Sequence, residues 1–150
     1  MSRLLRLPLV LALFATVGCG GAPATSTFAT RAEAGAAVAP WVPAGATDLR
    51  LATAEGSGAW WLRFRLPGAE RQALEPDLMR IPDTQVATLT FRAPKGVDWW
   101  FRGLVQVVPA RETTVIAADV YSGNGAEVPR GTFVAFDRAS DVVYAWQAGR

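Results

Sequence analysis

The chain has 150 residues, with 15 basic and 13 acidic side chains, one cysteine and no histidine. The lack of histidine excludes Ser-His and Cys-His relays and any zinc or copper site built on imidazole. A single cysteine excludes an internal disulfide framework. Loss of Arg3 and Arg6 with a leader would leave equal numbers of basic and acidic side chains. No sustained basic stripe remains, so we predict no nucleic-acid partner, and no residue pattern calls for a metal or cofactor.

The N-terminal segment has the pattern of an export signal. Arg3 and Arg6 precede an apolar run from Leu7 to Val17, and small residues follow that run. At about 1.5 Å per residue, a helix of this length covers about half of the roughly 30 Å hydrocarbon core of a bilayer. We therefore predict that residues 1–18 are a cleaved export signal and not a membrane span.

The signal ends on the only cysteine of the chain. The segment Thr16-Val17-Gly18-Cys19 resembles the lipobox of bacterial lipoproteins, although Thr16 stands where that motif usually has a large aliphatic residue. The resemblance implies that Cys19 is diacylated, becomes the new N-terminus and anchors the protein in the cell envelope, where the acyl chains bind the membrane. The glycine that follows the cysteine, Gly20, resembles the residue at that position in lipoproteins of the Gram-negative outer membrane. The alternative is an ordinary secreted protein in which Cys19 has no role.

Residues 19–40 are mostly small, with few large apolar side chains. Such a segment buries too little surface to fold alone, so we predict an acylated cysteine followed by a flexible tether that spans roughly 25 Å. A short helix over residues 30–38 is the alternative, because Arg31, Glu33 and several alanines permit it. Residues 41–150 then form a single domain of ordinary size.

Strand patterns dominate this domain. Residues 47–52 and 60–66 read as two strands, and Glu55-Gly56-Ser57-Gly58 between them reads as a hairpin loop. In the second strand Trp60, Leu62, Phe64 and Leu66 alternate with Trp61, Arg63 and Arg65, which indicates one buried face.

The remaining pattern contains one helix and further strands. Residues 69–79 carry apolar side chains near one-turn spacing, and Pro76 limits that helix. Together these elements predict an α+β fold, an antiparallel sheet of about five or six strands with one short helix packed on one face. The further strands are predicted over residues 85–92, 113–121, 132–136 and 142–147, the last two forming a terminal hairpin.

The layout resembles small uncharacterised bacterial lipoproteins. The residues that carry the resemblance are Trp41 to Ala44, Ala46 to Arg50, the Trp99-Trp100 pair and the closing segment Val143 to Trp146. It implies an exported α+β module and assigns no catalytic residues.

Six tryptophans, at positions 41, 60, 61, 99, 100 and 146, are the one constellation with possible chemistry. Adjacent residues of a strand point to opposite faces, so only one ring of each Trp-Trp pair can enter the same core layer. We predict Trp61, Arg63, Trp99 and Trp100 as a possible ligand or partner surface. The alternative is that the fold covers these rings or that arginines stack on them.

The sequence therefore favours a lipid-anchored envelope protein that acts by binding another envelope protein. A glycan or cell-wall binding module that uses exposed tryptophans is the alternative, and a histidine-independent hydrolase with Asp98 and Glu112 as an acid/base pair is a third. Asp137 and Asp141 flank a turn, where aspartates usually bond nearby backbone amides and do not bind calcium.

Overall fold

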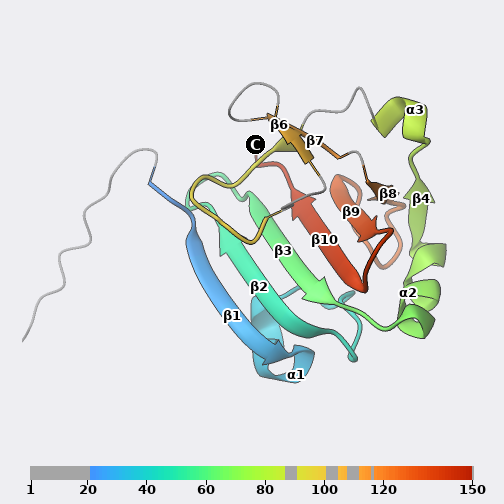
Figure 1. The fold of residues 1–150 in the computed structure, drawn as a ribbon. Coiled ribbons are helices and arrows are strands. Elements are labelled where there is room, and N and C mark those ends of the chain that lie inside the picture. Colours follow the sequence, from blue (N-terminus) through green and yellow to red (C-terminus); the bar gives the residue numbers. More distant parts are fainter. Residues whose placement is uncertain (1–20, 87–90, 101–104, 108–111, 116, 150) are drawn as a thin grey trace, which may run out of the picture.

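A computed structural model describes residues 21–86, 91–100, 105–107, 112–115 and 117–149. Its main feature is a seven-stranded antiparallel sheet with the order β1-β2-β3-β10-β9-β8-β4 (Figure 1). The strands are β1 (Ala24–Thr30), β2 (Thr47–Thr53), β3 (Trp60–Arg65), β4 (Leu78–Arg80), β8 (Ala118–Gly123), β9 (Thr132–Asp137) and β10 (Val142–Gln147).

A second, three-stranded sheet and several short helices complete the fold. The second sheet has the order β5-β7-β6, with β5 (Phe91–Arg92), β6 (Val105–Val107) and β7 (Glu112–Val115). The helices are α1 (Arg31–Ala34), α2 (Gly68–Leu74) and α3 (Asp83–Val86), with single 3-10 turns η1 (Gly35–Ala37) and η2 (Glu75–Asp77).

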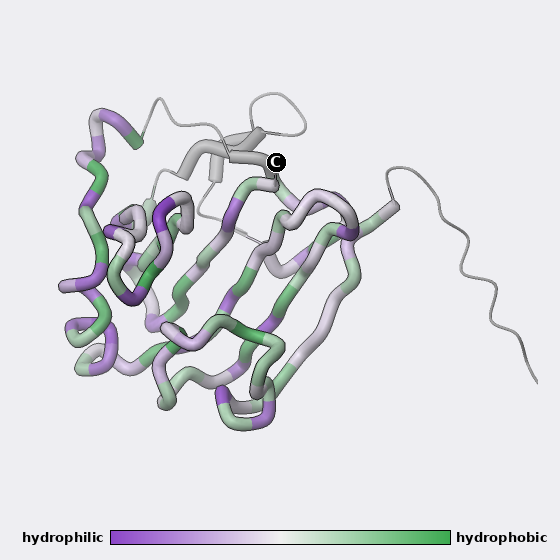
Figure 2. The backbone as a smooth tube through the Cα atoms, turned by 180° about the vertical axis from the view of Figure 1, so that it is seen from behind, coloured by the Kyte–Doolittle hydropathy of each residue, from purple (hydrophilic) through white to green (hydrophobic). Residues whose placement is uncertain are grey.

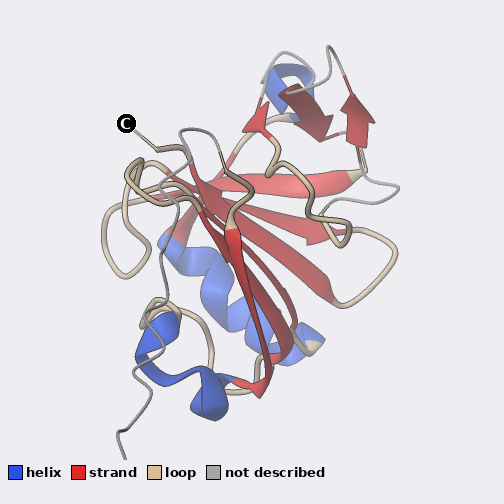
Figure 3. Ribbon diagram, turned by 90° about the vertical axis from the view of Figure 1, so that its left-hand side faces the viewer, coloured by secondary structure: helices blue, strands red, loops and turns tan. Residues whose placement is uncertain are grey.

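Each face of the main sheet supports its own hydrophobic cluster. One cluster joins Leu62 and Phe64 of β3 to residues of α1 and α2, and we call this side the helix face. The other joins Trp61 of β3 to α3 and to Trp100, and we call this side the tryptophan face. Seen from the β1 edge in Figure 3, α1 and α2 lie on one side of the sheet and the small sheet lies toward the other. The sheet is thus covered on both faces over much of its area.

The two predicted hairpins are confirmed. β2 pairs with β3 around the glycine-containing loop, and β9 pairs with β10 around the turn that begins after Asp137. The predicted alternation in β3 also holds, because Trp60, Leu62 and Phe64 belong to the helix-face cluster and Trp61 to the other. Figure 2 shows this alternation of hydrophilic and hydrophobic residues along the strands.

The helix predicted within residues 69–79 is present and stops before Pro76, as predicted. α2 ends at Leu74, and Pro76 lies in the following 3-10 turn, after which the chain enters β4. The predicted strand over residues 85–92 holds only at its end, in β5, because Gln85 and Val86 belong to α3. Residues 87–90 lie outside the described part of the chain.

The prediction of a flexible tether over residues 19–40 is wrong from Ala24 onward. β1 pairs with β2 in a continuous register from Ala24 opposite Thr53 to Phe28 opposite Leu49. The alternative helix is confirmed as α1 and η1, and Thr30 caps α1 by accepting a hydrogen bond from the Glu33 amide at 3.2 Å. The folded unit therefore begins near residue 24 and not at residue 41.

The α+β class with an antiparallel sheet is confirmed, whereas the predicted five or six strands and single helix are too few. Sequence reasoning missed β6 of the small sheet and the two edge strands of the main sheet, and its single strand over residues 113–121 is divided between β7 and β8 of different sheets. β1 is largely exposed and β4 has three residues, so neither carries the alternation that marks a half-buried strand.

Candidate functional site

The predicted surface residues Trp61, Trp99 and Trp100 lie in the cluster on the tryptophan face. Trp100 makes edge-to-face contacts with Tyr144 and Trp146, with ring centroids 5.5 and 5.8 Å apart. Trp61 is 4% exposed and Trp100 is 8% exposed, whereas Trp99 is partly exposed at the margin. The structure thus brings these three rings together as packing, and two of them offer little surface to a ligand.

Arg63 lies on the same face but its guanidinium is held by Asp48. The Arg63 Nη1 and Asp48 Oδ2 atoms are 2.7 Å apart, and Arg50 reaches the other carboxylate oxygen at 3.3 Å. Burial raises the pKa of the Tyr144 hydroxyl, and the neighbouring charge of Arg63 partly offsets that effect. Arg63 therefore links β3 to the irregular start of β2, where Asp48 has a φ of 47°.

The ion pair of Asp48 should make the free energy of unfolding depend on pH. Burial alone would raise the pKa of the Asp48 carboxyl, but the hydrogen bond and charge of Arg63, followed by Arg50, bring it below its usual value of 3.8. A lowered folded-state pKa contributes stability above the unfolded value that is lost as the pH falls through the folded value. Asp48→Asn keeps a residue that tolerates positive φ, and should cost about 0.5–1 kcal/mol at neutral pH.

Chemical unfolding of the native chain and of Asp48→Asn over a pH series measures the difference between their free energies of unfolding. It should stay constant down to the usual value of 3.8 and then shrink toward zero in acid. A difference that grows in acid would contradict the assignment.

A second charged group lies between α2, α3 and the β9–β10 turn. Asp119 accepts from Arg138 and Arg80, each at 3.1 Å, and lies 3.4 Å from Arg71. Arg138 also contacts Asp83 at 2.9 Å. Glu75 lies 3.8 Å from Arg71, so three arginines face three carboxylates, and the cluster holds the elements together without an excess of charge for a ligand.

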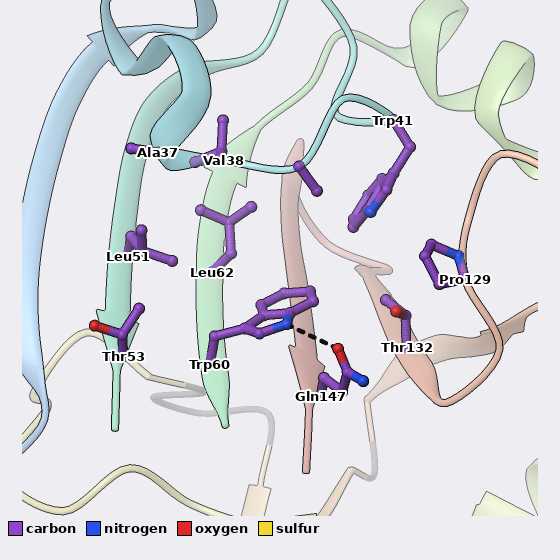
Figure 4. Close-up of a pocket in the computed structure, with 11 residues that line it drawn as sticks. Ala37, Val38, Trp41, Leu51, Thr53, Trp60, Leu62, Pro129, Thr132 and Gln147 are labelled. Carbon is purple, nitrogen blue, oxygen red and sulfur yellow. Dashed lines mark hydrogen bonds between the residues drawn. The ribbon is translucent and has the colours of Figure 1, made fainter. Parts of the chain in front are cut away.

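The helix face has an apolar pocket of about 240 Å³ (Figure 4). Its floor is formed by Leu51 and Leu62 of β2 and β3, and its cover by Val38 and Trp41, which follow η1. The full lining consists of Ala37, Val38, Ala39, Trp41, Leu51, Thr53, Trp60, Leu62, Pro129, Thr132 and Gln147.

Apart from the indole of Trp41, the polar side chains of the pocket come from one row across the sheet. The strand registers place Thr53 opposite Trp60, Trp60 opposite Gln147, and Gln147 opposite Thr132. We call these four residues the terminal row; β1 begins beside it, because Ala24 pairs with Thr53. The next row inward, which includes Leu51 and Leu62, is apolar. The pocket therefore has an apolar interior and a neutral polar rim.

Trp60 is the aromatic wall of this rim. Its Nε1 donates a hydrogen bond to the Gln147 Oε1 at 3.0 Å, which fixes the orientation of the indole (Figure 4). The residues that line the pocket carry no charged side chain. A neutral ligand with an apolar body fits this chemistry, since a buried unpaired charge would be costly here.

Of the first tryptophan pair, the predicted surface residue Trp61 is buried, and its neighbour Trp60 lines the pocket. Trp61 alternates with Arg63, which suggests an exposed face, but that face is covered by the segment that carries Trp100. Trp60 lies on the helix face, where Thr53, Trp60 and Gln147 of the terminal row are partly exposed and Thr132 is buried. The sequence shows only that Trp60 begins one predicted strand and Gln147 ends another, and the structure adds that these two ends pair.

The other predicted site residues give no competing site within the described residues. Asp137 forms the turn as predicted, accepting from the Ala139 amide at 2.8 Å and from the Ser140 hydroxyl at 2.6 Å. Asp98 is exposed, while Glu112 belongs to β7 and its side chain lies outside the description, as does Cys19. The described residues contain no group of three or more acidic or cysteine side chains placed to hold a metal ion. Among them there is also no helix long and apolar enough to cross a membrane.

Comparisons of this chain with protein-family models, with curated proteins and with solved structures found no match.

Proposed function

We propose that this chain is a lipid-anchored protein of the cell envelope whose domain acts by binding another envelope protein. The signal and the cysteine at its end support the anchor. The pocket beside Trp60 supports the binding role, and we propose it as the contact for the partner.

The size and lining of the pocket favour a side chain of a protein over a free small molecule. Its volume of about 240 Å³ is below the roughly 300–1,000 Å³ typical of small-molecule sites. An apolar side chain would fill the interior between Leu62 and Trp41, while the adjoining peptide group would meet Thr53 and Gln147 at the rim. Anchors of this kind, an apolar or aromatic side chain in a well-packed pocket, dominate many protein interfaces.

The lipid anchor is tested by replacing the cysteine. Cells that produce the native chain should incorporate radiolabelled palmitate into it and retain it in the membrane fraction. Cys19→Ala should abolish both label and retention, because it removes the only thiol that can be acylated. A native chain without label in the soluble fraction would contradict the anchor and favour the secreted alternative.

The partner is tested by photo-crosslinking in intact cells. A photoreactive residue in place of Thr53, at the pocket rim, should link to another envelope protein, whereas one in place of Ala139, at the β9–β10 turn, should not. Ala37→Phe should remove most of the adduct, because Ala37 is exposed and lines the pocket, so a larger side chain fills the cavity without disturbing the core.

A glycan is the alternative ligand of the pocket, and tryptophan fluorescence tests it. Trp60 is partly exposed beside two neutral hydrogen-bonding side chains, an arrangement on which a sugar ring can stack. Soluble cell-wall fragments that quench tryptophan fluorescence in the native chain and not in Trp60→Ala would favour the glycan alternative. A Thr53 adduct that survives Ala37→Phe would place the protein contact elsewhere.

A further inference from the structure

The two edges of the main sheet differ in how they are protected. β4 has three residues, lies between Pro76 and Pro82, and ends on the charged and exposed Arg80. β1 has seven residues, with no proline, glycine or charged side chain among them. Short length, proline and charge are the devices by which native proteins prevent strand addition, and β4 uses all three.

The outer edge of β1 pairs with no other strand of the described chain, since β1 ends the strand order (Figure 1). Six of its seven residues are exposed, and only Phe28 is partly buried. Its register against β2 runs from Ala24 to Phe28 without a bulge, so its backbone groups form a regular row over these residues; beyond them the Ala29 amide donates to the Glu33 carboxylate at 2.8 Å. A regular, uncharged and exposed edge is a template for another strand.

We propose that β1 pairs with β1 of a second copy of this chain, which joins the two main sheets into one continuous antiparallel sheet across a two-fold axis. This contact is separate from the pocket and does not depend on acylation of Cys19. Among antiparallel registers only one pairs all seven residues, and it places Thr27 opposite Thr27 of the second copy.

The composition of β1 makes this pairing self-complementary. In the full register Thr25 faces Ala29 of the second copy and Ser26 faces Phe28 of the second copy. No like charges meet, and Thr-Thr contacts at the centre are favourable cross-strand pairs. A strand without charge gives little basis for selecting a foreign partner by electrostatics, whereas a second copy matches it in length and in side chains.

The pairing is compatible with the proposed anchor. An antiparallel pair of seven-residue strands places the two Ala24 residues about 20 Å apart, at opposite ends of the pair. Both chains can then reach the same membrane. Anchoring on one surface also raises the effective concentration of the second copy, which favours a contact as small as one pair of strands.

Disulfide trapping of the full chain in intact cells tests the register. Opposed residues of antiparallel strands have Cα atoms about 4.5–5.5 Å apart, within the range of a disulfide. Thr27→Cys should form a disulfide-linked dimer on mild oxidation, and Ala139→Cys, on the β9–β10 turn, should not. Thr25→Cys should link poorly to itself but should link to Ala29→Cys when the two differently tagged variants are produced together.

Charged substitutions at Thr27 test the pairing without oxidation. Thr27→Lys alone and Thr27→Glu alone should each reduce co-purification of two tagged copies, because like charges would face each other at the centre of the pair. Production of both variants together should restore it, and this rescue shows that neither variant is misfolded. Within one chain Thr27 is paired with Arg50, so the glutamate is also compatible with the fold.

Three results would overturn the proposal. One is a Thr27→Cys chain that stays monomeric while Thr27→Lys and Thr27→Glu together give no rescue. Another is a Thr27→Cys chain that forms a disulfide with a different protein and not with a second copy of itself. The third is a Thr27→Cys chain that forms no more linked dimer than the unsubstituted chain, because residue 27 would then add nothing to a link through Cys19. Loss of the Thr53 photo-adduct leaves all three readouts unchanged, so the pocket and the edge are tested separately.

Discussion

Replacement of Trp146 by alanine should lower the free energy of unfolding by about 3–5 kcal/mol, one of the two largest effects expected for this chain. Trp146 is 2% exposed in β10 and stacks on Phe133 with ring centroids 5.5 Å apart. Trp100 contacts its other side at 5.8 Å, so the loss would leave a cavity between the sheet and the segment that covers it. Denaturant unfolding, followed by circular dichroism, measures the change.

Trp60→Ala is the matched control, because it removes the same side chain from a neighbouring strand. Trp60 is partly exposed at the pocket rim, so its loss should cost distinctly less than the loss of Trp146. Equal costs would contradict the assignment of Trp60 to the pocket and of Trp146 to the core.

Gly123→Ala should cost about 2–3 kcal/mol, because the new methyl group would meet backbone atoms that cannot move aside. A Cβ at this position would lie 2.2 Å from the Pro129 carbonyl oxygen and 2.6 Å from the Val128 carbonyl oxygen. Gly123 ends β8 opposite Leu78 of β4, so the chain that follows folds back closely over this edge. Thermal or chemical unfolding of the variant measures the cost.

Gly68→Ala serves as the control for this substitution. A Cβ on Gly68 would meet no atom within 4 Å, and Gly68 is the first residue of α2. Because alanine favours a helix, this variant should be as stable as the native chain or slightly more stable. A Gly123→Ala chain as stable as Gly68→Ala would contradict the close approach of residues 128 and 129.

The central strands were predictable because their side chains alternate and their loops contain turn residues. In β3, Leu62 and Phe64 face the helix side while Trp61 faces the other, and in β10 Ala145 faces the helix side while Trp146 faces the other. The β2–β3 and β9–β10 loops are rich in glycine, serine and aspartate, which adopt turns readily. Local pattern and tertiary structure agree at these positions, so sequence reasoning located both hairpins.

β1 was missed because its stability does not come from its own side chains. Its residues are small and exposed, and Phe28 is the only large apolar side chain among them. The ladder with β2 holds the strand, and its partners lie 17 to 29 positions away, so no local pattern encodes the pairing.

The pocket was missed for a related reason. The alternation of Trp61 with Arg63 correctly indicates two faces but does not show that both are covered. Coverage depends on where Trp100 and the segment after η1 lie, and these are tertiary facts. Sequence reasoning therefore left open which rings the fold covers, and only the structure shows that Trp61 is buried and Trp60 is partly exposed.

The early start of β1 limits how far the domain can stand from a bilayer. With Cys19 acylated as proposed, five residue steps separate the lipid attachment from Ala24, which at about 3.3–3.6 Å each gives a maximum height of about 18 Å. Because Ala24 pairs with Thr53, this short connection keeps the rim of the pocket near the membrane surface. A partner would then have to meet the pocket close to the lipid headgroups.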